Sequence, residues 1–160
     1  ANGFTLELKV TSTYDFLRAP AEIIQAQLAP LSIKVNITAQ EFSVYLPDIL
    51  KKNYMATILG ESGQGDPDDY LYTPFASDSG GNLTNFKDTD VDRLLDQGRS
   101  TSDPAARKAI YAQVQKRLVD LSPMVFLYSS TQYEATSKRV QGYQHFPNTS
   151  YLGLRTTWLK

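Results

Sequence analysis

The chain has 160 residues, with 16 Lys and Arg against 17 Asp and Glu, one His and no Cys. This length suits one domain with its own core, and the absence of Cys excludes disulfides, Cys-based zinc sites and thiol nucleophiles. A net charge of −1 gives no basis for strong non-specific nucleic-acid binding, one His cannot build a multi-histidine metal site, and no apolar run reaches the about 20 residues of a membrane span.

The first third of the chain alternates between strand and helix patterns. Residues 4–10 and 33–37 show the period of two expected of strands with one buried face. Residues 20–31 carry apolar side chains at helical spacing, and residues 45–50 mark a shorter helix. Residues 55–59 form an apolar run that predicts a third, more buried strand. Strands separated by helices predict an α/β fold with a mainly parallel sheet flanked by helices.

The second half of the chain is predicted to be mostly helical. A helix is expected over residues 88–99, and a second one over 103–121 with Asp103 as its N-cap and Pro at its first position. The apolar run Met124–Tyr128, directly after Pro123, predicts a fourth strand. Residues 141–160 show little periodicity, so they are expected to form an irregular tail.

A Gly- and Asp-rich loop over residues 60–72 is the most informative local feature. It follows a predicted buried strand and leads into a helix, which is where open α/β sheets bind ligands. The glycine spacing matches neither a dinucleotide fingerprint nor a P-loop. Two interpretations stay open. In one, Asp66 is the N-cap of a helix with Pro67 at its first position; in the other, the loop binds a ligand. Local sequence favours the first.

Catalysis and metal binding have weaker support in the residues. Glu61 and Asp66 have the chemistry of a general acid/base pair, which keeps a small α/β hydrolase as an alternative. A stand-alone α/β interaction module is a further alternative. Asp66, Asp68 and Asp69 lack the spacing of a calcium loop, so they are better interpreted as acids complementing a helix N-terminus. His145 is expected to have a surface or packing role.

Several motifs occur in an order that resembles a known family. The motifs are Ala21-Glu-Ile-Ile-Gln-Ala-Gln-Leu28 followed by Ile33–Ile37, Gly65-Asp-Pro-Asp-Asp-Tyr-Leu71, Val91-Asp-Arg-Leu-Leu95, and Asp103-Pro-Ala-Ala-Arg-Lys-Ala-Ile-Tyr111. With Pro123 before an apolar strand and Val140-Gln-Gly-Tyr143 after it, the chain resembles the C-terminal lobe of the dipeptide/oligopeptide-type (family 5) extracellular solute-binding proteins, the receptors of ABC importers.

The resemblance implies a type II periplasmic-binding-protein-like lobe over residues 1–140, with 141–160 crossing back towards an N-terminal lobe of the same parent protein. The chain is then one lobe of a longer protein, and no signal sequence is expected within it. The implied function is non-catalytic binding of a small solute (a peptide, a sugar or an opine-like compound) for an ABC permease, without cofactor, metal or nucleic acid. The implied location is the periplasm, or outside the cell with a membrane tether.

The resemblance also points to candidate ligand-binding residues. In the family, the loop ahead of the Asp-Pro-Asp motif lines the solute cleft, and peptide-binding members place there an Asp that pairs with the peptide's amino group. That position is Gly63 here, so the amine-binding carboxylate is missing and Glu61 is the available substitute. Arg18 lies near where some dipeptide binders hold a ligand carboxylate. The expected site residues are Arg18, Glu61, Ser62, Gly63, Gln64, Asp66 and Asn82.

Overall fold

The computed structural model describes residues 3–61, 65–129, 131, 133–146 and 150–160. The chain divides into two compact units. Unit 1 comprises Ala1–Glu61 with Asp78–Phe86, and unit 2 comprises Ser62–Ser77 with Lys87–Lys160. Unit 1 contains a parallel sheet with flanking helices, which confirms the predicted α/β class.

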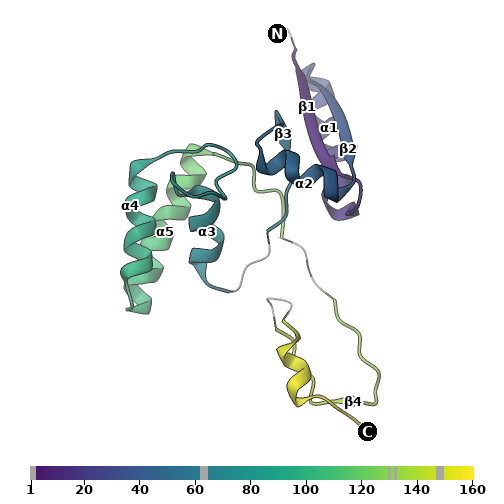
Figure 1. Cartoon of the computed structure of the whole chain (residues 1–160), viewed down its shortest axis with the longest axis vertical. Coiled ribbons are helices and arrows are strands. Elements are labelled where there is room, and N and C mark those ends of the chain that lie inside the picture. Colours follow the sequence, from purple (N-terminus) through teal and green to yellow (C-terminus); the bar gives the residue numbers. More distant parts are fainter. Residues whose placement is uncertain (1–2, 62–64, 130, 132, 147–149) are drawn as a thin grey trace. The chain divides into compact units, whose positions relative to one another are not determined.

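Unit 1 is a β-α-β-α-β arrangement. Its strands are β1 (Thr5–Thr11), β2 (Lys34–Gln40) and β3 (Ala56–Thr57), in the order β2-β1-β3 and all parallel. The first connection is α1 (Asp15–Leu28) with the short 3-10 helix η1 (Ala29–Leu31), and the second is α2 (Phe42–Leu50). Three parallel strands therefore end at one edge of the sheet, next to the starts of both helices (Figure 1).

The two helices cover opposite faces of β1, because successive side chains of a strand point to opposite sides. Leu8 and Val10 share the core of unit 1 with Leu17 and Ala21 of α1. Lys9, between them, points the other way, and its Nζ lies 2.6 Å from Asp48 Oδ2 of α2. The Lys9 ammonium lowers the pKa of Asp48 by donating this hydrogen bond.

Helix α1 begins five residues earlier than the sequence pattern suggested, and Pro20 lies inside it. A proline is favoured in the first turn of a helix, which is why Pro20 looked like the start. Leu17 is buried in the core, so packing of the extra turn on the sheet outweighs the hydrogen bond that Pro20 cannot donate.

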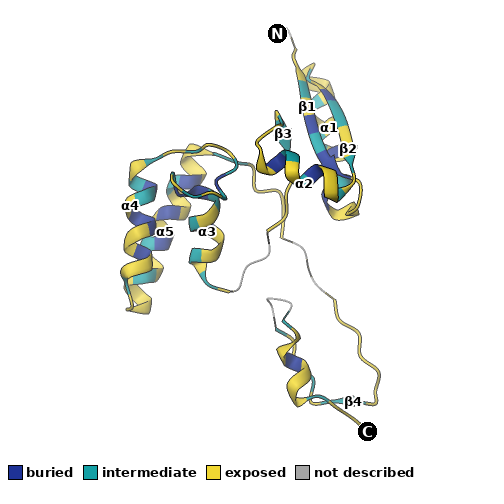
Figure 2. Ribbon diagram, viewed as in Figure 1, coloured by how far each residue is buried: buried dark blue, intermediate teal, exposed yellow. Residues whose placement is uncertain are grey.

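Three α-helices in the described part of unit 2 each have an Asp side chain as the N-cap. The helices are α3 (Pro67–Phe75), α4 (Thr89–Ser100) and α5 (Pro104–Leu121). The caps are Asp66, Asp88 and Asp103, whose carboxylates accept hydrogen bonds from backbone N–H groups of the first turn. Figure 2 marks buried positions on all three helices. They are Leu71, Phe75, Val91, Leu94, Leu95, Tyr111, Val114 and Leu118.

The remainder of unit 2 departs from the sequence prediction. The predicted strand Met124–Tyr128 is wrong: residues 123–129 form no strand. A strand needs a neighbouring strand, and the two sheets of the described chain do not include this segment, in which Val125 is 81% exposed. The expected irregular tail contains a two-stranded antiparallel sheet, β4 (Val140–Gln141) with β5 (Trp158–Leu159), and the 3-10 helix η2 (Tyr151–Thr156).

Among the described residues, every helix is too short or too polar to cross a lipid bilayer.

Candidate functional site

The carboxyl edge of the unit 1 sheet is held together by polar side chains that follow β1 and β2. Ser12 Oγ and Thr13 Oγ1 donate hydrogen bonds to the Glu41 carboxylate, at 3.3 and 3.1 Å. Thr13 Oγ1 also accepts the backbone N–H of Phe42 at 3.0 Å, and the Ser12 N–H donates to the Gln40 carbonyl. The loop after β1 is therefore fixed to the start of α2, which gives this edge a defined shape.

Three aromatic side chains gather on this edge: Tyr14, Phe16 and Phe42, here called the edge aromatic cluster. The Tyr14 ring centroid lies 5.6 Å from that of Phe16 and 5.2 Å from that of Phe42, the second pair being edge-to-face. Tyr14 is 40% exposed and Phe16 58% exposed. Rings at these distances attract one another, and their remaining surface faces solvent.

The chain after β3 reaches the same edge. A Cβ placed on Gly60 would lie 3.5 Å from Phe16 Cε2 and 3.5 Å from Leu17 Cδ2, so the Gly60 backbone packs directly against the start of α1. Glu61 follows Gly60 and is exposed, and it forms no ion pair within the described residues. Glu61 is thus a carboxylate next to the cluster that a ligand could approach.

Arg18 lies one turn into α1, close to this edge in sequence, but its guanidinium is engaged on the helix surface. It pairs with Asp15 at 3.3 Å and with Glu22 one turn further on. Its side chain is 40% exposed. Binding a ligand carboxylate would require Arg18 to leave these exposed pairs, which are weak in water.

Asn82 is buried and organises its own loop in unit 1. Its Nδ2 donates to the Phe86 carbonyl at 2.6 Å, and its Oδ1 accepts the Phe86 N–H at 3.2 Å. The loop is tied to the chain before β3, where the Tyr54 hydroxyl donates to the Leu83 carbonyl at 2.7 Å. Asn82 therefore acts within this structure by shaping the loop.

Asp66 lies in unit 2 and has two structural partners. Its carboxylate caps α3 and accepts two hydrogen bonds from the Arg107 guanidinium of α5, both at 2.7 Å. The hydrogen bonds from Arg107, and to a smaller extent the one from the backbone N–H of Asp68, lower the pKa of Asp66 to about 2. Asp66 is therefore ionised at neutral pH, as a helix cap and as the ion-pair partner of Arg107. The capping interpretation of this residue is confirmed.

The other three predicted site residues, Ser62, Gly63 and Gln64, lie outside the described residues. Of the remaining four, the structure places Arg18, Glu61 and Asn82 in unit 1 and Asp66 in unit 2. Glu61 and Arg18 follow the carboxyl ends of β3 and β1 respectively, whereas Asn82 lies in the separate loop of residues 78–86.

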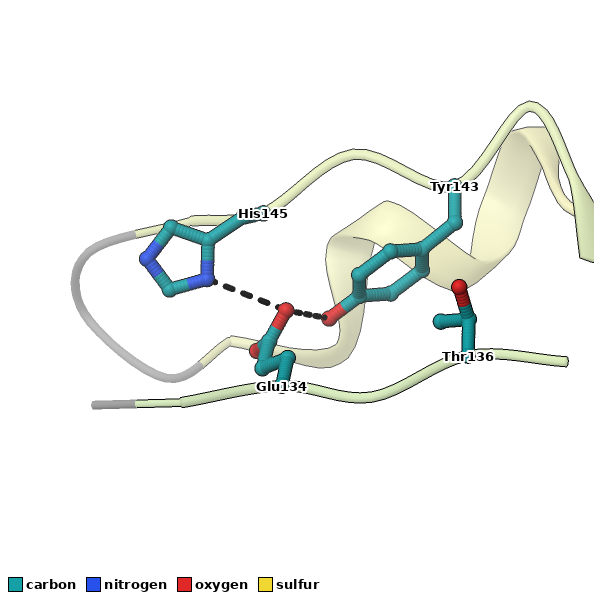
Figure 3. A pocket seen from close by; sticks show the side chains of 4 residues that line it. All are labelled: Glu134, Thr136, Tyr143 and His145. Carbon is teal, nitrogen blue, oxygen red and sulfur yellow. Dashed lines mark hydrogen bonds and ion pairs between the residues drawn. The ribbon is translucent and has the colours of Figure 1, made fainter.

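A second surface feature lies in unit 2, where Glu134, Thr136, Tyr143 and His145 line an open pocket (Figure 3). The Tyr143 hydroxyl donates to Glu134 Oε2 at 2.6 Å, and His145 Nδ1 lies 3.1 Å from the same oxygen. The Tyr143 hydrogen bond, and then His145, lower the pKa of Glu134, while the carboxylate raises the pKa of Tyr143. The three side chains link residues 134–136 to residues 143–145, and His145 has the surface role that the sequence predicted.

No group of three or more His, Asp or Glu side chains in the described part of the chain is arranged to hold a metal ion.

Comparison with known proteins identifies what this arrangement is similar to. No protein-family profile matches the chain. A dipeptide-binding protein of Pseudomonas aeruginosa is 33% identical over 130 residues, which is 79% of this chain and 24% of that protein. The chain is homologous to one part of the dipeptide/oligopeptide-binding proteins. It spans about a quarter of the length of these curated relatives.

Solved structures share the fold over nearly the whole chain. HbpA2 of Haemophilus parasuis matches with a TM-score of 0.85 and 27% identity, covering 99% of this chain and 32% of that one. AgaA of Agrobacterium tumefaciens R10, solved in complex with agropinic acid, matches with a TM-score of 0.77 and 29% identity, covering 99% of this chain and 34% of that one. The predicted periplasmic-binding-protein-like fold is confirmed.

Sequence reasoning missed the edge aromatic cluster and the Glu41 carboxylate, which holds the loop after β1 through hydrogen bonds from Ser12 and Thr13. A signal was present, because Tyr14 follows β1 by three residues and Phe42 follows β2 by two. Aromatic residues just after predicted parallel strands lie at the edge where α/β sheets bind ligands. That the three rings touch depends on how α1 and α2 pack, which spacing along the chain does not give.

Proposed function

We propose that this chain is one lobe of the substrate-binding component of an ABC-type importer, which binds a peptide or a related small solute without catalysis. The observation that carries the proposal is the 33% identity to a dipeptide-binding protein over 79% of the chain, of which the chain spans only 24%. The implied partners are the N-terminal lobe of the same parent protein and an ABC permease. The implied location is the periplasm or the outer face of a membrane.

The proposed contribution of this chain is one wall of the solute cleft. The wall consists of the carboxyl edge of the unit 1 sheet. At this edge the backbone of Gly60 packs on α1, and the Glu41 carboxylate holds the loop after β1 by accepting hydrogen bonds from Ser12 and Thr13. Glu61 supplies a carboxylate for a cationic group, in place of the one missing at Gly63, and Arg18 supplies a cation for a ligand carboxylate. Ser62, Gly63 and Gln64, which lie outside the described residues, are kept as proposed ligand-binding residues on the family resemblance.

Asp66 and Asn82 are proposed to act on the solute through the loops that they hold. Asp66 fixes the start of α3 directly after the ligand loop, and Asn82 fixes the loop of residues 78–86. The solute class remains one of peptide, sugar or opine-like compound. Peptides have the strongest support because the curated relatives are dipeptide-binding proteins, and the agropinic acid complex of AgaA supports an opine-like solute.

The proposal is tested on the longest natural polypeptide that contains this chain. That protein is purified without added solute, its co-purifying small molecules are identified by mass spectrometry, and their affinities are measured by calorimetry. Glu61→Gln is expected to weaken binding of a cationic solute about tenfold, the effect of losing one charge-assisted hydrogen bond. Asp96→Asn, an exposed carboxylate on α4, is the matched control and should leave the affinity unchanged.

Two results would count against the proposal in different ways. If no peptide, sugar or opine-like compound co-purifies or binds, the solute-binding function is wrong. If a cationic solute binds but Glu61→Gln and Arg18→Gln leave its affinity unchanged, the function stands and the assignment of these residues is wrong.

A further inference from the structure

The edge aromatic cluster exposes apolar side-chain surface to solvent. Phe16 belongs to α1, yet its side chain is 58% exposed, whereas the next residue, Leu17, is 6% exposed and fills the core. Phe42 is half-buried and links the cluster to the core through Tyr45, whose ring centroid lies 6.2 Å away. The cluster therefore contacts the buried Tyr45 ring through Phe42, while Tyr14 and Phe16 are exposed to solvent.

The rings are arranged so that another ring can join them. Tyr14 contacts Phe42 edge-to-face, with 71° between the ring planes, and contacts Phe16 in a tilted arrangement at 33°. Aromatic groups prefer edge-to-face or offset contacts of this kind. An added aromatic group would gain both burial and a ring contact, and no side chain would have to be displaced from the core.

The charges beside the cluster limit which group can occupy it. Asp15 lies between Tyr14 and Phe16 in sequence, and Glu41 directly precedes Phe42. The Glu41 carboxylate accepts hydrogen bonds from two hydroxyl groups and forms no ion pair with a Lys or Arg among the described residues. An acidic side chain placed here would meet the Glu41 carboxylate as a like charge, so the surface disfavours an acidic group relative to an uncharged ring.

We propose that the edge aromatic cluster is a subsite for an uncharged aromatic side chain of a peptide-like solute. This inference rests on the proposed solute-binding function and names the chemistry that the carboxyl edge of the unit 1 sheet selects. Gly60 contributes by its small size, because a Cβ there would already lie in contact with Phe16, at 3.5 Å from its Cε2.

The test compares three dipeptides, Ala-Phe, Ala-Ala and Ala-Glu, by calorimetry on the longest natural polypeptide that contains the chain. Ala-Phe is expected to bind tightest and Ala-Glu weakest. Phe16→Ala and Tyr14→Ala should each weaken Ala-Phe binding about 3- to 10-fold, the range that one aromatic contact supplies, and change Ala-Ala binding less than about 2-fold. Phe4→Ala is the matched control, because Phe4 is also 58% exposed but precedes β1, at the opposite edge of the sheet.

The outcomes separate this inference from the function on which it rests. Dipeptide binding without preference for Ala-Phe, or equal losses for Ala-Phe and Ala-Ala in the Phe16→Ala variant, would overturn the subsite and leave solute binding intact. Loss of Ala-Phe binding in the Phe4→Ala variant as large as in Phe16→Ala would also overturn it. If no dipeptide, sugar or opine-like compound binds, the proposed function fails and the subsite with it.

Discussion

Replacing Asp66 by Asn should expose how much the ion pair with Arg107 contributes to unit 2. Asn keeps an oxygen that can accept the N–H of Asp68, so the helix cap survives while the charge is lost. The pKa of Asp66 is lowered from 3.8 to about 2, which corresponds to about 2.5 kcal/mol at neutral pH. Because the Asp66 side chain is 47% exposed, solvent screening reduces the expected contribution to about 1 kcal/mol.

The pH dependence of this contribution has a definite sign. A carboxyl whose pKa is lowered by folding stabilises the folded chain above its unfolded pKa, here 3.8, and the stabilisation disappears as the pH falls through about 2. The free energy of unfolding is measured by urea denaturation followed by far-UV circular dichroism. The wild type should exceed Asp66→Asn by about 1 kcal/mol at neutral pH and by much less near pH 2.

The same measurements test whether the Asp66 charge is the source of the stability difference. A stability difference between wild type and Asp66→Asn that stays constant from neutral pH to about pH 2 would mean that the carboxylate charge is not the source. Asp96→Asn, on the exposed face of α4, is the control for losing one negative charge and should change stability by less than about 0.5 kcal/mol. A carbon-detected NMR titration of the Asp66 carboxyl reports its pKa directly.

Substitutions at three further positions test interactions inside unit 1 and inside unit 2. Tyr45→Phe removes a buried hydroxyl that donates to a backbone carbonyl at 2.7 Å, and thermal unfolding should show a loss of about 1–2 kcal/mol. Gly98→Ala would place a Cβ 2.7 Å from Tyr111 Cζ, so the buried Tyr111 ring or the helices must shift. We expect a loss of about 1–3 kcal/mol, against less than about 0.5 kcal/mol for an exposed helical position. Asp103→Ala removes the N-cap of α5 and should cost about 1 kcal/mol in urea denaturation, whereas Asp103→Asn should cost little.

The parts of the fold that local sequence could predict are those set by interactions between near neighbours. Asp66 and Asp103 bond to N–H groups two and three residues further on, so a cap followed by Pro identifies each helix start without knowledge of the rest. The period of two in β1 and β2 likewise reflects one buried face, and the observed parallel pairing follows from the helix between them.

The parts that local sequence could not predict depend on contacts between distant segments. Arg107 reaches Asp66 across 41 positions, and nothing in either segment alone indicates the pairing. The early start of α1 depends on Leu17 packing against β1. The candidate site shows the same limit: the glycine-rich loop was visible in the sequence, whereas the edge aromatic cluster arises only when the loops after β1 and β2 meet.

The segment Met124–Tyr128 shows why an apolar run is a weaker predictor than a helix cap. A cap is satisfied within its own helix, so its signal holds in any context. A strand is satisfied only by a neighbouring strand, and this segment has none within the described chain. The ring contact of Phe126 with Phe75, at 6.4 Å between centroids, leaves Phe126 62% exposed. Apolar periodicity therefore indicates that the segment can enter a sheet, and the presence of a partner strand decides whether it does.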